Sequence, residues 1–397
     1  MKQPLYLILP TFLLVCLLAR CVDPLDYKVI ALSKILVVEG IITDQEGPYT
    51  ISLNWSSSLD TLVFLPVTGA YVRIEEEGGM TETLSEGLQG KYNTSAGGIR
   101  GRIGGKYQLL IDLADGRKYQ SDWMELRRVP AIDSVYYSLS EILTFDGPIR
   151  GMQIYLDTRD PENQTRYYRW TWEETWKYEV PYPDYLQFLG LGQNQVAFKD
   201  PPNEVCWQSA SSDRIRVAAS IRNQTDVIAA YPLFFVPASD HRLQIRYSLL
   251  LRQYSMSEPE YLFWNKLQES SQTGGGLFDV QPQSVRGNIW NIADLREPVL
   301  GYFSASAVAE KRIYINRSEV QSEVDKSYLD NCRINLDTIF TGVNSQDSVL
   351  RRVRSGEVFY DFYREVTTIR GYILTSRECS DCTSRGGSIE QPGFWVE

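Results

Sequence analysis

The sequence predicts a mainly β protein, with a small antiparallel sandwich followed by a larger antiparallel β domain that carries one or two helices. Three observations predict this fold class. Stretches of alternating apolar and polar residues recur along the chain, glycine-rich turns separate them, and one segment after residue 256 has helical periodicity. Alternation is typical of half-buried strands, because successive side chains point to opposite faces, and short strands at this spacing are typical of sandwiches.

An apolar leader precedes the predicted strands. Residues 5–18 form a nearly unbroken apolar run after Lys2, which is short for a membrane span and typical of a signal-peptide core. The run ends in Leu17-Leu18-Ala19-Arg20-Cys21, which resembles a bacterial lipobox, although Arg20 stands where Gly, Ala or Ser is usual. We expect residues 1–20 to be a lipoprotein signal peptide and Cys21 to be lipidated. The alternative is a plain signal peptide cleaved nearby.

Residues 21–34 are interpreted as a tether. They begin with the acidic stretch Val22-Asp23-Pro24-Leu25-Asp26, which resembles the surface-export tether of Bacteroidota lipoproteins; a solvated linker explains it equally well. No later apolar run reaches the length of about 18 residues that a spanning helix needs. We therefore expect a protein held on the outer membrane by its lipid, facing the cell exterior.

The first domain is expected over residues 35–130, up to the linker-like Val129-Pro130-Ala131. Apolar and polar residues alternate over 51–56, 70–75 and 107–113, and glycine pairs mark turns between them. The motifs Gly90-Lys91-Tyr92 and Gly104-Gly105-Lys106-Tyr107 resemble prealbumin-like and carboxypeptidase-regulatory-like modules. That resemblance implies a small immunoglobulin-like sandwich.

The second domain, residues 131–397, is predicted to be β-rich and closed by disulfides. Tyr168, Trp170 and Trp172 alternate with polar residues, and alternation over 243–251 indicates another strand. Residues 176–188, which are rich in Trp, Tyr and Pro, are interpreted as an ordered loop.

One helix is predicted near residue 260. Ser257 followed by Glu260 matches a capping box, and Pro259 suits a first helical turn. Phe263, Trp264 and Leu267 then fall on one helical face, and Gly274-Gly275-Gly276 is expected to end the helix. We expect this helix to lie across the sandwich.

The remaining cysteines are Cys206, Cys332, Cys379 and Cys382. Outside the cytoplasm they can form two disulfides, in any of three pairings. Cys379-Ser380-Asp381-Cys382 also has the spacing of a redox centre or half a zinc site. No βαβ context accompanies it, and only two isolated cysteines remain to complete a metal site. We expect structural disulfides and no metal; a local Cys379–Cys382 bridge is the strained alternative.

The residues available for catalysis are few. The chain has one histidine, His241, and no G-x-S-x-G motif accompanies it. Glu173 and Glu174 are adjacent, so on a strand they point to opposite faces and do not form the carboxylate pair of a glycoside hydrolase. A formal charge of −10 argues against nucleic acid as a partner. We expect neither an enzyme nor a cofactor.

Aromatic residues make up 12% of the chain, more than the predicted strands explain. Trp176, Tyr178, Tyr182 and Tyr185 lie outside the predicted alternation, so we expect them to contact a ligand or partner.

Several stretches carry a family resemblance: residues 36–44, 130–135, 287–289 and 299–303, and Cys379-Ser380-Asp381-Cys382-Thr383-Ser384-Arg385-Gly386-Gly387 with Pro392-Gly393-Phe394-Trp395. Together they resemble the domain-of-unknown-function family 4249 of Bacteroidota. Members of that family are predicted outer-membrane lipoproteins, often encoded beside TonB-dependent transporters, and have no assigned catalytic residues. The resemblance therefore implies a place at the outer membrane and a transporter as neighbour.

The leading functional hypothesis is a surface-exposed lipoprotein that works with a TonB-dependent transporter, by capturing a ligand, capping the transporter or stabilising the complex. The alternative is a free-standing adhesin or glycan-binding lipoprotein. A glycoside hydrolase is the third and least favoured hypothesis.

Overall fold

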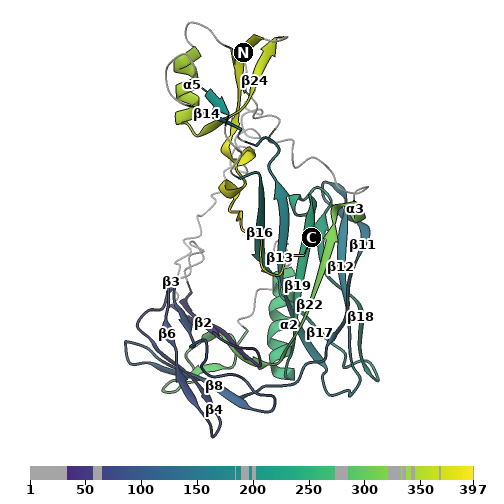
Figure 1. Ribbon diagram of the computed structural model, residues 1–397. Helices are drawn as coiled ribbons and strands as arrows, with labels where there is room; N and C mark the ends of the chain where they lie inside the picture. Colours follow the sequence, from purple (N-terminus) through teal and green to yellow (C-terminus); the bar gives the residue numbers. More distant parts are fainter. Residues whose placement is uncertain are drawn as a thin grey trace, which may run out of the picture.

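The computed structural model describes residues 34–56, 65–183, 185–188, 196–198, 203–272, 285–320, 332, 337–340, 345–365 and 368–396. These residues form two β-sandwiches and a smaller C-terminal module (Figure 1). The mainly β fold class is thereby confirmed. The predicted leader and tether, Cys21, and the glycines at 274–276 lie outside the described residues. Within the described part, no helix has both the length and the apolar character to cross a membrane.

The first sandwich, at the lower left of Figure 1, has two six-stranded sheets. One sheet has the order β21 (Val299–Ser306), β1 (Leu36–Thr43), β2 (Thr50–Trp55), β7 (Lys91–Asn93) and β6 (Ser85–Glu86), with β3 (Leu65–Pro66) beside β2. The other has the order β20 (Ile289–Asn291), β9 (Lys118–Ser121), β8 (Lys106–Asp112), β4 (Tyr71–Glu76) and β5 (Thr81–Thr83), with β10 (Met124–Glu125) beside β8.

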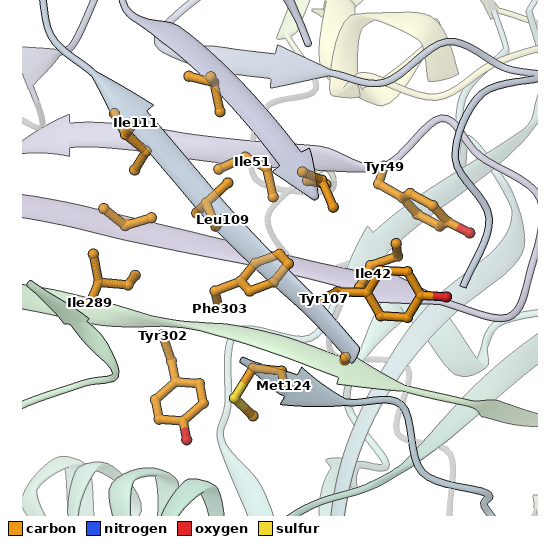
Figure 2. Packing of buried hydrophobic residues seen from close by; sticks show 14 of the residues in the cluster. Ile42, Tyr49, Ile51, Tyr107, Leu109, Ile111, Met124, Ile289, Tyr302 and Phe303 are labelled. Atoms are coloured by element: carbon orange, nitrogen blue, oxygen red, sulfur yellow. The ribbon is translucent and has the colours of Figure 1, made fainter. Parts of the chain in front are cut away.

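The predicted boundary at Pro130 does not separate the sheets. The chain returns to the first sandwich after residue 285, where β20 pairs with β9 and β21 pairs in parallel with β1 from Leu36↔Val299 to Thr43↔Ser306. Figure 2 shows the result: Ile289 and Phe303 lie in the same core as Ile51 and Leu109. Each sheet of the first sandwich thus takes one edge strand from the predicted second domain.

The second sandwich packs two further sheets. One has the order β11 (Ile132–Thr144), β12 (Gly147–Asp160) and β18 (Asp226–Pro237). The other has the order β16 (Val205–Ser211), β13 (Tyr167–Glu179), β19 (Arg246–Ser255) and β22 (Val308–Asn316), with β17 (Arg216–Ala219) beside β13. Trp172 stacks on Phe234 across the layers, with ring centroids 4.6 Å apart, so the aromatic strand faces the core.

Strand β13 is longer than the sequence analysis expected. The predicted loop over 176–188 is wrong at both ends, because β13 continues to Glu179 and β14 occupies Leu186–Phe188. The predicted strand face that began at Leu243 is also shorter. Leu243 lies in the short helix η1 (His241–Leu243), which Asp240 caps by accepting a hydrogen bond from the Arg242 N–H.

The predicted helix is confirmed as α2 (Glu258–Gln272), and its Glu260 N–H donates to Ser257 Oγ at 3.4 Å. It lies between the two sandwiches (Figure 1). Phe263 packs on Tyr302 of β21, with ring centroids 5.0 Å apart, while Arg169 of β13 covers the Trp264 ring at 3.9 Å. The apolar face of α2 therefore joins the sandwiches, because each contributes a side chain to it.

The C-terminal module contains the described remainder of the chain. The short helix α3 (Arg317–Val320) first follows β22, and the module's sheet has the order β23 (Asp337–Phe340), β25 (Thr368–Ser376) and β24 (Glu357–Glu365). The module also holds α5 (Ser345–Arg354), the pair β14 and β15 (Val196–Phe198), and the short helices η3 (Arg377–Cys379) and η4 (Cys382–Arg385).

Candidate functional site

The four predicted cysteines form two disulfides, Cys206–Cys382 and Cys332–Cys379. The expectation of structural disulfides is confirmed, and the local Cys379–Cys382 bridge does not form. Each half of the C-x-x-C motif is therefore linked to a distant segment. Among the described residues, no group of three His, Cys, Asp or Glu side chains is placed to hold a metal.

A C-terminal strap, residues 382–396, follows the first of these disulfides along β16. Trp207 and Ser388 exchange two backbone hydrogen bonds of 2.8 Å. Gly387 allows this close approach, because a Cβ there would lie 2.5 Å from the Tyr178 hydroxyl. Trp395 then meets Trp207 edge to face, with ring centroids 6.3 Å apart. The cysteine, glycine and tryptophan residues of 379–387 and 392–395 therefore have a structural role: they fasten the C-terminal strap to β16.

Two of the four predicted contact residues are buried in the core of the second sandwich. Trp176 and Tyr178 are 5% and 1% exposed, so the expectation that they contact a ligand is wrong for the folded chain. The Tyr178 hydroxyl donates to the Cys382 carbonyl at 2.6 Å, and the Tyr182 N–H donates to the Cys379 carbonyl at 3.1 Å. Only Tyr185 is exposed, and Tyr182 is half-buried.

The sequence contained a signal for this burial. The apolar alternation that begins at Tyr168 continues at even-numbered positions through Trp176 and Tyr178, which is the pattern of one long strand. Glu174 interrupts the apolar series without changing its period. That residue is buried too, because it accepts hydrogen bonds from Arg242 Nη1 at 2.6 Å and from the Tyr247 hydroxyl at 2.5 Å.

His241 lies beside this network. Its Nδ1 is 3.4 Å from Asp240 Oδ1, and its ring meets Trp176 edge to face. Burial lowers the pKa of His241, and the Asp240 carboxylate opposes that shift. Glu173 points to the other face, where it lies 3.8 Å from Arg252, as strand alternation predicts. The acids and the histidine here serve ion pairs and packing.

A cleft of about 570 Å³ opens between the two sandwiches. Its arginines already have partners. Arg127 pairs with Glu125 at 3.2 Å, and Arg128 pairs with Asp160 at 2.9 Å. Arg166 donates to the Ser220 carbonyl at 3.3 Å. The polar groups of the cleft therefore hold loops and strands in place.

Pro259 lines this cleft, and the next residue of α2, Glu260, is buried, with 3% of its surface exposed. It accepts a hydrogen bond from Ser304 Oγ of β21 at 2.5 Å. Burial raises the pKa of Glu260 to about 7, since removal from water disfavours the charged form. This carboxyl is a polar contact between α2 and the first sandwich.

The β11–β12 hairpin carries a feature that the sequence analysis missed. Strand β18 accompanies β12 as far as the pair Gly151↔Pro237, and the Ala238 N–H still donates to the Arg150 carbonyl at 2.9 Å. Residues 142–149 extend beyond that point as a two-stranded ribbon. Leu143 and Phe145 near its turn are 86% and 105% exposed. The sequence offered a signal here: Ile142 and Leu143 break the alternation just before a turn marked by Asp146 and Gly147.

A family model matches most of the described chain. The model of the family described as "Domain of unknown function (DUF4249)" matches residues 22–312. The matched range covers the described strands from β1 into β22 and ends before the strap. No curated protein matches the chain.

Proposed function

Because the chain belongs to the DUF4249 family, we propose a function that its architecture and its sequence resemblance jointly support. The protein is a lipid-anchored lipoprotein of the outer-membrane surface. It serves as a non-catalytic partner of a TonB-dependent transporter, whose complex it stabilises or whose ligand it helps to capture.

The observation that carries this proposal is the projecting β11–β12 ribbon. Large apolar side chains that stand free in water are a feature of interaction sites, because their exposure is unfavourable unless a partner covers them. The acids and arginines described above support the same proposal, because they form ion pairs and hydrogen bonds with other residues of the fold. Both features favour contact over chemical conversion.

The predicted anchor supports a partner at the membrane. Residues 22–34 can span at most about 45 Å between Cys21 and the start of the first sandwich. A body held within that distance of the outer membrane meets the extracellular parts of membrane proteins at high effective concentration.

Co-purification tests the proposal. The tagged protein, extracted from native outer membranes in mild detergent, is expected to bring a TonB-dependent transporter in a fixed ratio. Cys21→Ser is expected to leave the membrane fraction, and so serves as the control for anchoring. Recovery of the anchored protein without any transporter would overturn the proposal, and continued membrane attachment of Cys21→Ser would overturn lipidation at that residue.

An exposed aromatic pair favours the second candidate, a free-standing glycan-binding or adhesin lipoprotein. Phe340 of β23 and Tyr363 of β24 are both exposed, with ring centroids 5.2 Å apart. Exposed aromatic rings can stack on sugars. Glycan-array binding that disappears in Phe340→Ala and Tyr363→Ala would favour this candidate over the transporter partner.

A further inference from the structure

We propose that residues 142–149 of the β11–β12 hairpin are the docking element of this protein, and that they insert into an apolar pocket with a basic rim on a protein partner. The inference rests on the proposed function and deepens it, because it names the contacting segment and the chemistry of the surface that receives it.

The ribbon has a neighbouring strand on neither edge. In the second sandwich, β12 is hydrogen-bonded on both sides only from Arg150 onward, where the Ala238 N–H donates to the Arg150 carbonyl and β18 then accompanies β12 from Gly151. Before that point the hairpin consists of β11 and the first residues of β12, paired as far as Thr144↔Gly147. A two-stranded ribbon is marginally stable in water by itself. A surface that covers one of its faces would stabilise it.

Four apolar side chains of the hairpin, Leu139, Ile142, Leu143 and Phe145, are exposed. Leu143 and Phe145 lie at the tip of the ribbon, beside and within the turn. Ile142 lies on the opposite face of β11 from Leu143, because successive side chains of a strand alternate, and Leu139 lies before the ribbon, opposite Met152. Leucine and phenylalanine at the tip of a convex element match the anchor residues that fill pockets in protein interfaces. A projecting tip needs a concave receptor.

The charge at the tip favours a protein pocket over a lipid bilayer. Asp146, next to Phe145, is the one charged residue in the tip segment 143–148. Glu141 and Arg150 pair with each other at 3.4 Å on the strands behind it. Surface-bound elements usually combine apolar residues with Lys or Arg, which attract anionic lipids. Burying the Asp146 carboxylate with Phe145 is unfavourable in lipid and favourable beside an Arg or Lys of a partner.

The test uses the anchored full chain in native outer membranes. A photo-crosslinking phenylalanine analogue replaces Phe145, and the same analogue replaces Leu88 in a control. Leu88 lies in a turn of the first sandwich, and 87% of its surface is exposed. It is therefore a control for an apolar side chain that is as exposed as Leu143 of the hairpin, which is 86% exposed. We expect position 145 to cross-link to one outer-membrane protein, at a peptide that contains apolar residues and an Arg or Lys, and position 88 to give no such product.

Substitutions then measure the contact. Phe145→Ser and Leu143→Ser are each expected to reduce recovery of the transporter about tenfold, as for anchor residues of an interface, and Asp146→Lys is expected to reduce it as well. Leu88→Ser is expected to leave recovery unchanged. Unchanged thermal unfolding of each variant shows that the loss does not come from misfolding.

Three outcomes would overturn the inference. In the first, the hairpin variants recover the transporter as the unsubstituted protein does, in which case the proposed function stands and only the docking element is wrong. In the second, the Cys21→Ser protein floats with vesicles of phosphatidylethanolamine and phosphatidylglycerol in a Phe145-dependent manner, which would identify the bilayer as the receptor. In the third, it forms dimers in solution that Phe145→Ser abolishes. Absence of any transporter from every preparation would instead refute the proposed function.

Discussion

At the residue scale, the carboxyl of Glu260 lies where α2 meets β21. Burial raises its pKa from about 4.5 to about 7, and this outweighs the Ser304 hydrogen bond and the charges of Arg169 and Arg127, which favour the ionised form. In the unfolded chain the group ionises near its ordinary pKa, so between these two values the unfolded state binds fewer protons. The free energy of unfolding therefore falls as pH rises from about 4.5 to about 7, and this contribution levels off above that range.

Glu260→Gln is expected to remove this pH dependence, because the amide oxygen still accepts the Ser304 hydrogen bond and carries no charge. At pH about 8.5 the variant should be more stable than the unsubstituted protein by up to about 3 kcal/mol. Urea unfolding at pH about 5 and about 8.5 measures the difference. Glu258→Gln, an exposed residue of the same helical turn, is the control. Equal pH slopes for the Glu260→Gln variant and the unsubstituted protein would contradict the prediction.

Gly301 is the residue on which the parallel pairing of β1 and β21 depends. Its φ is +96°, and a Cβ would lie 1.8 Å from the Val38 carbonyl oxygen. Gly301→Ala therefore combines backbone strain with a clash against β1, and we expect a loss of about 3 kcal/mol or more in unfolding free energy. Gly78→Ala separates the two causes, because Gly78 has a φ of +68° and nothing near its Cβ position. That control should lose only about 1 kcal/mol.

At the element scale, the strap and the Cys206–Cys382 disulfide hold β16 from outside. The disulfide closes a loop of 176 residues, and loss of such a link typically costs about 2 to 5 kcal/mol. The double variant Cys206→Ser, Cys382→Ser should lose stability in this range. Its tryptophan emission spectrum should also change, because Trp395 is expected to move away from Trp207. Cys332→Ser with Cys379→Ser is the control, expected to leave the fluorescence of Trp207 unchanged. Free thiols at all four positions in the unsubstituted protein would contradict the disulfide assignment.

The elements also show how far the sequence predicts the fold. Alternation identified β2, β4 and β8 and the capping box identified α2, because these signals depend on neighbours along the chain. The same signals do not predict which strands pair with each other. A period of two tells which side chains face the core, but nothing local to residues 299–306 says that they pair with β1. The disulfide pairing was open for the same reason, since it depends on which segments the fold brings together.

The candidate site was predicted less well than the fold. Trp176 and Tyr178 were expected at a contact surface because their strand was ended too early. Leu143 at the end of β11 and Phe145 in the following turn were overlooked, because large apolar residues are ordinarily assigned to the core. Whether such a residue is buried depends on the length of the neighbouring strand. Here β18 ends at Pro237, which is far along the chain from the hairpin turn, so the sequence of β11 does not indicate where that strand ends.

At the scale of the whole molecule, the two sandwiches are interleaved rather than joined in series. The chain completes most of the first sandwich, builds much of the second, then returns to add β20 and β21 before it continues into β22. The first sandwich without its return segment would lack an edge strand in each sheet and would expose core positions that Ile289 and Phe303 cover. The two bodies should therefore unfold together.

Fragment complementation tests this interdependence. Residues 35–130 alone are expected to remain largely unfolded, because the uncovered core costs more than the remaining contacts supply. Fusion of residues 285–307 to the same fragment through a flexible linker should restore a cooperative thermal transition, because β21 can then pair with β1. The same fusion carrying Gly301→Ala should fail to restore it, which excludes a nonspecific effect of added apolar residues. A cooperative transition in residues 35–130 alone would show that the first sandwich is complete before the chain returns.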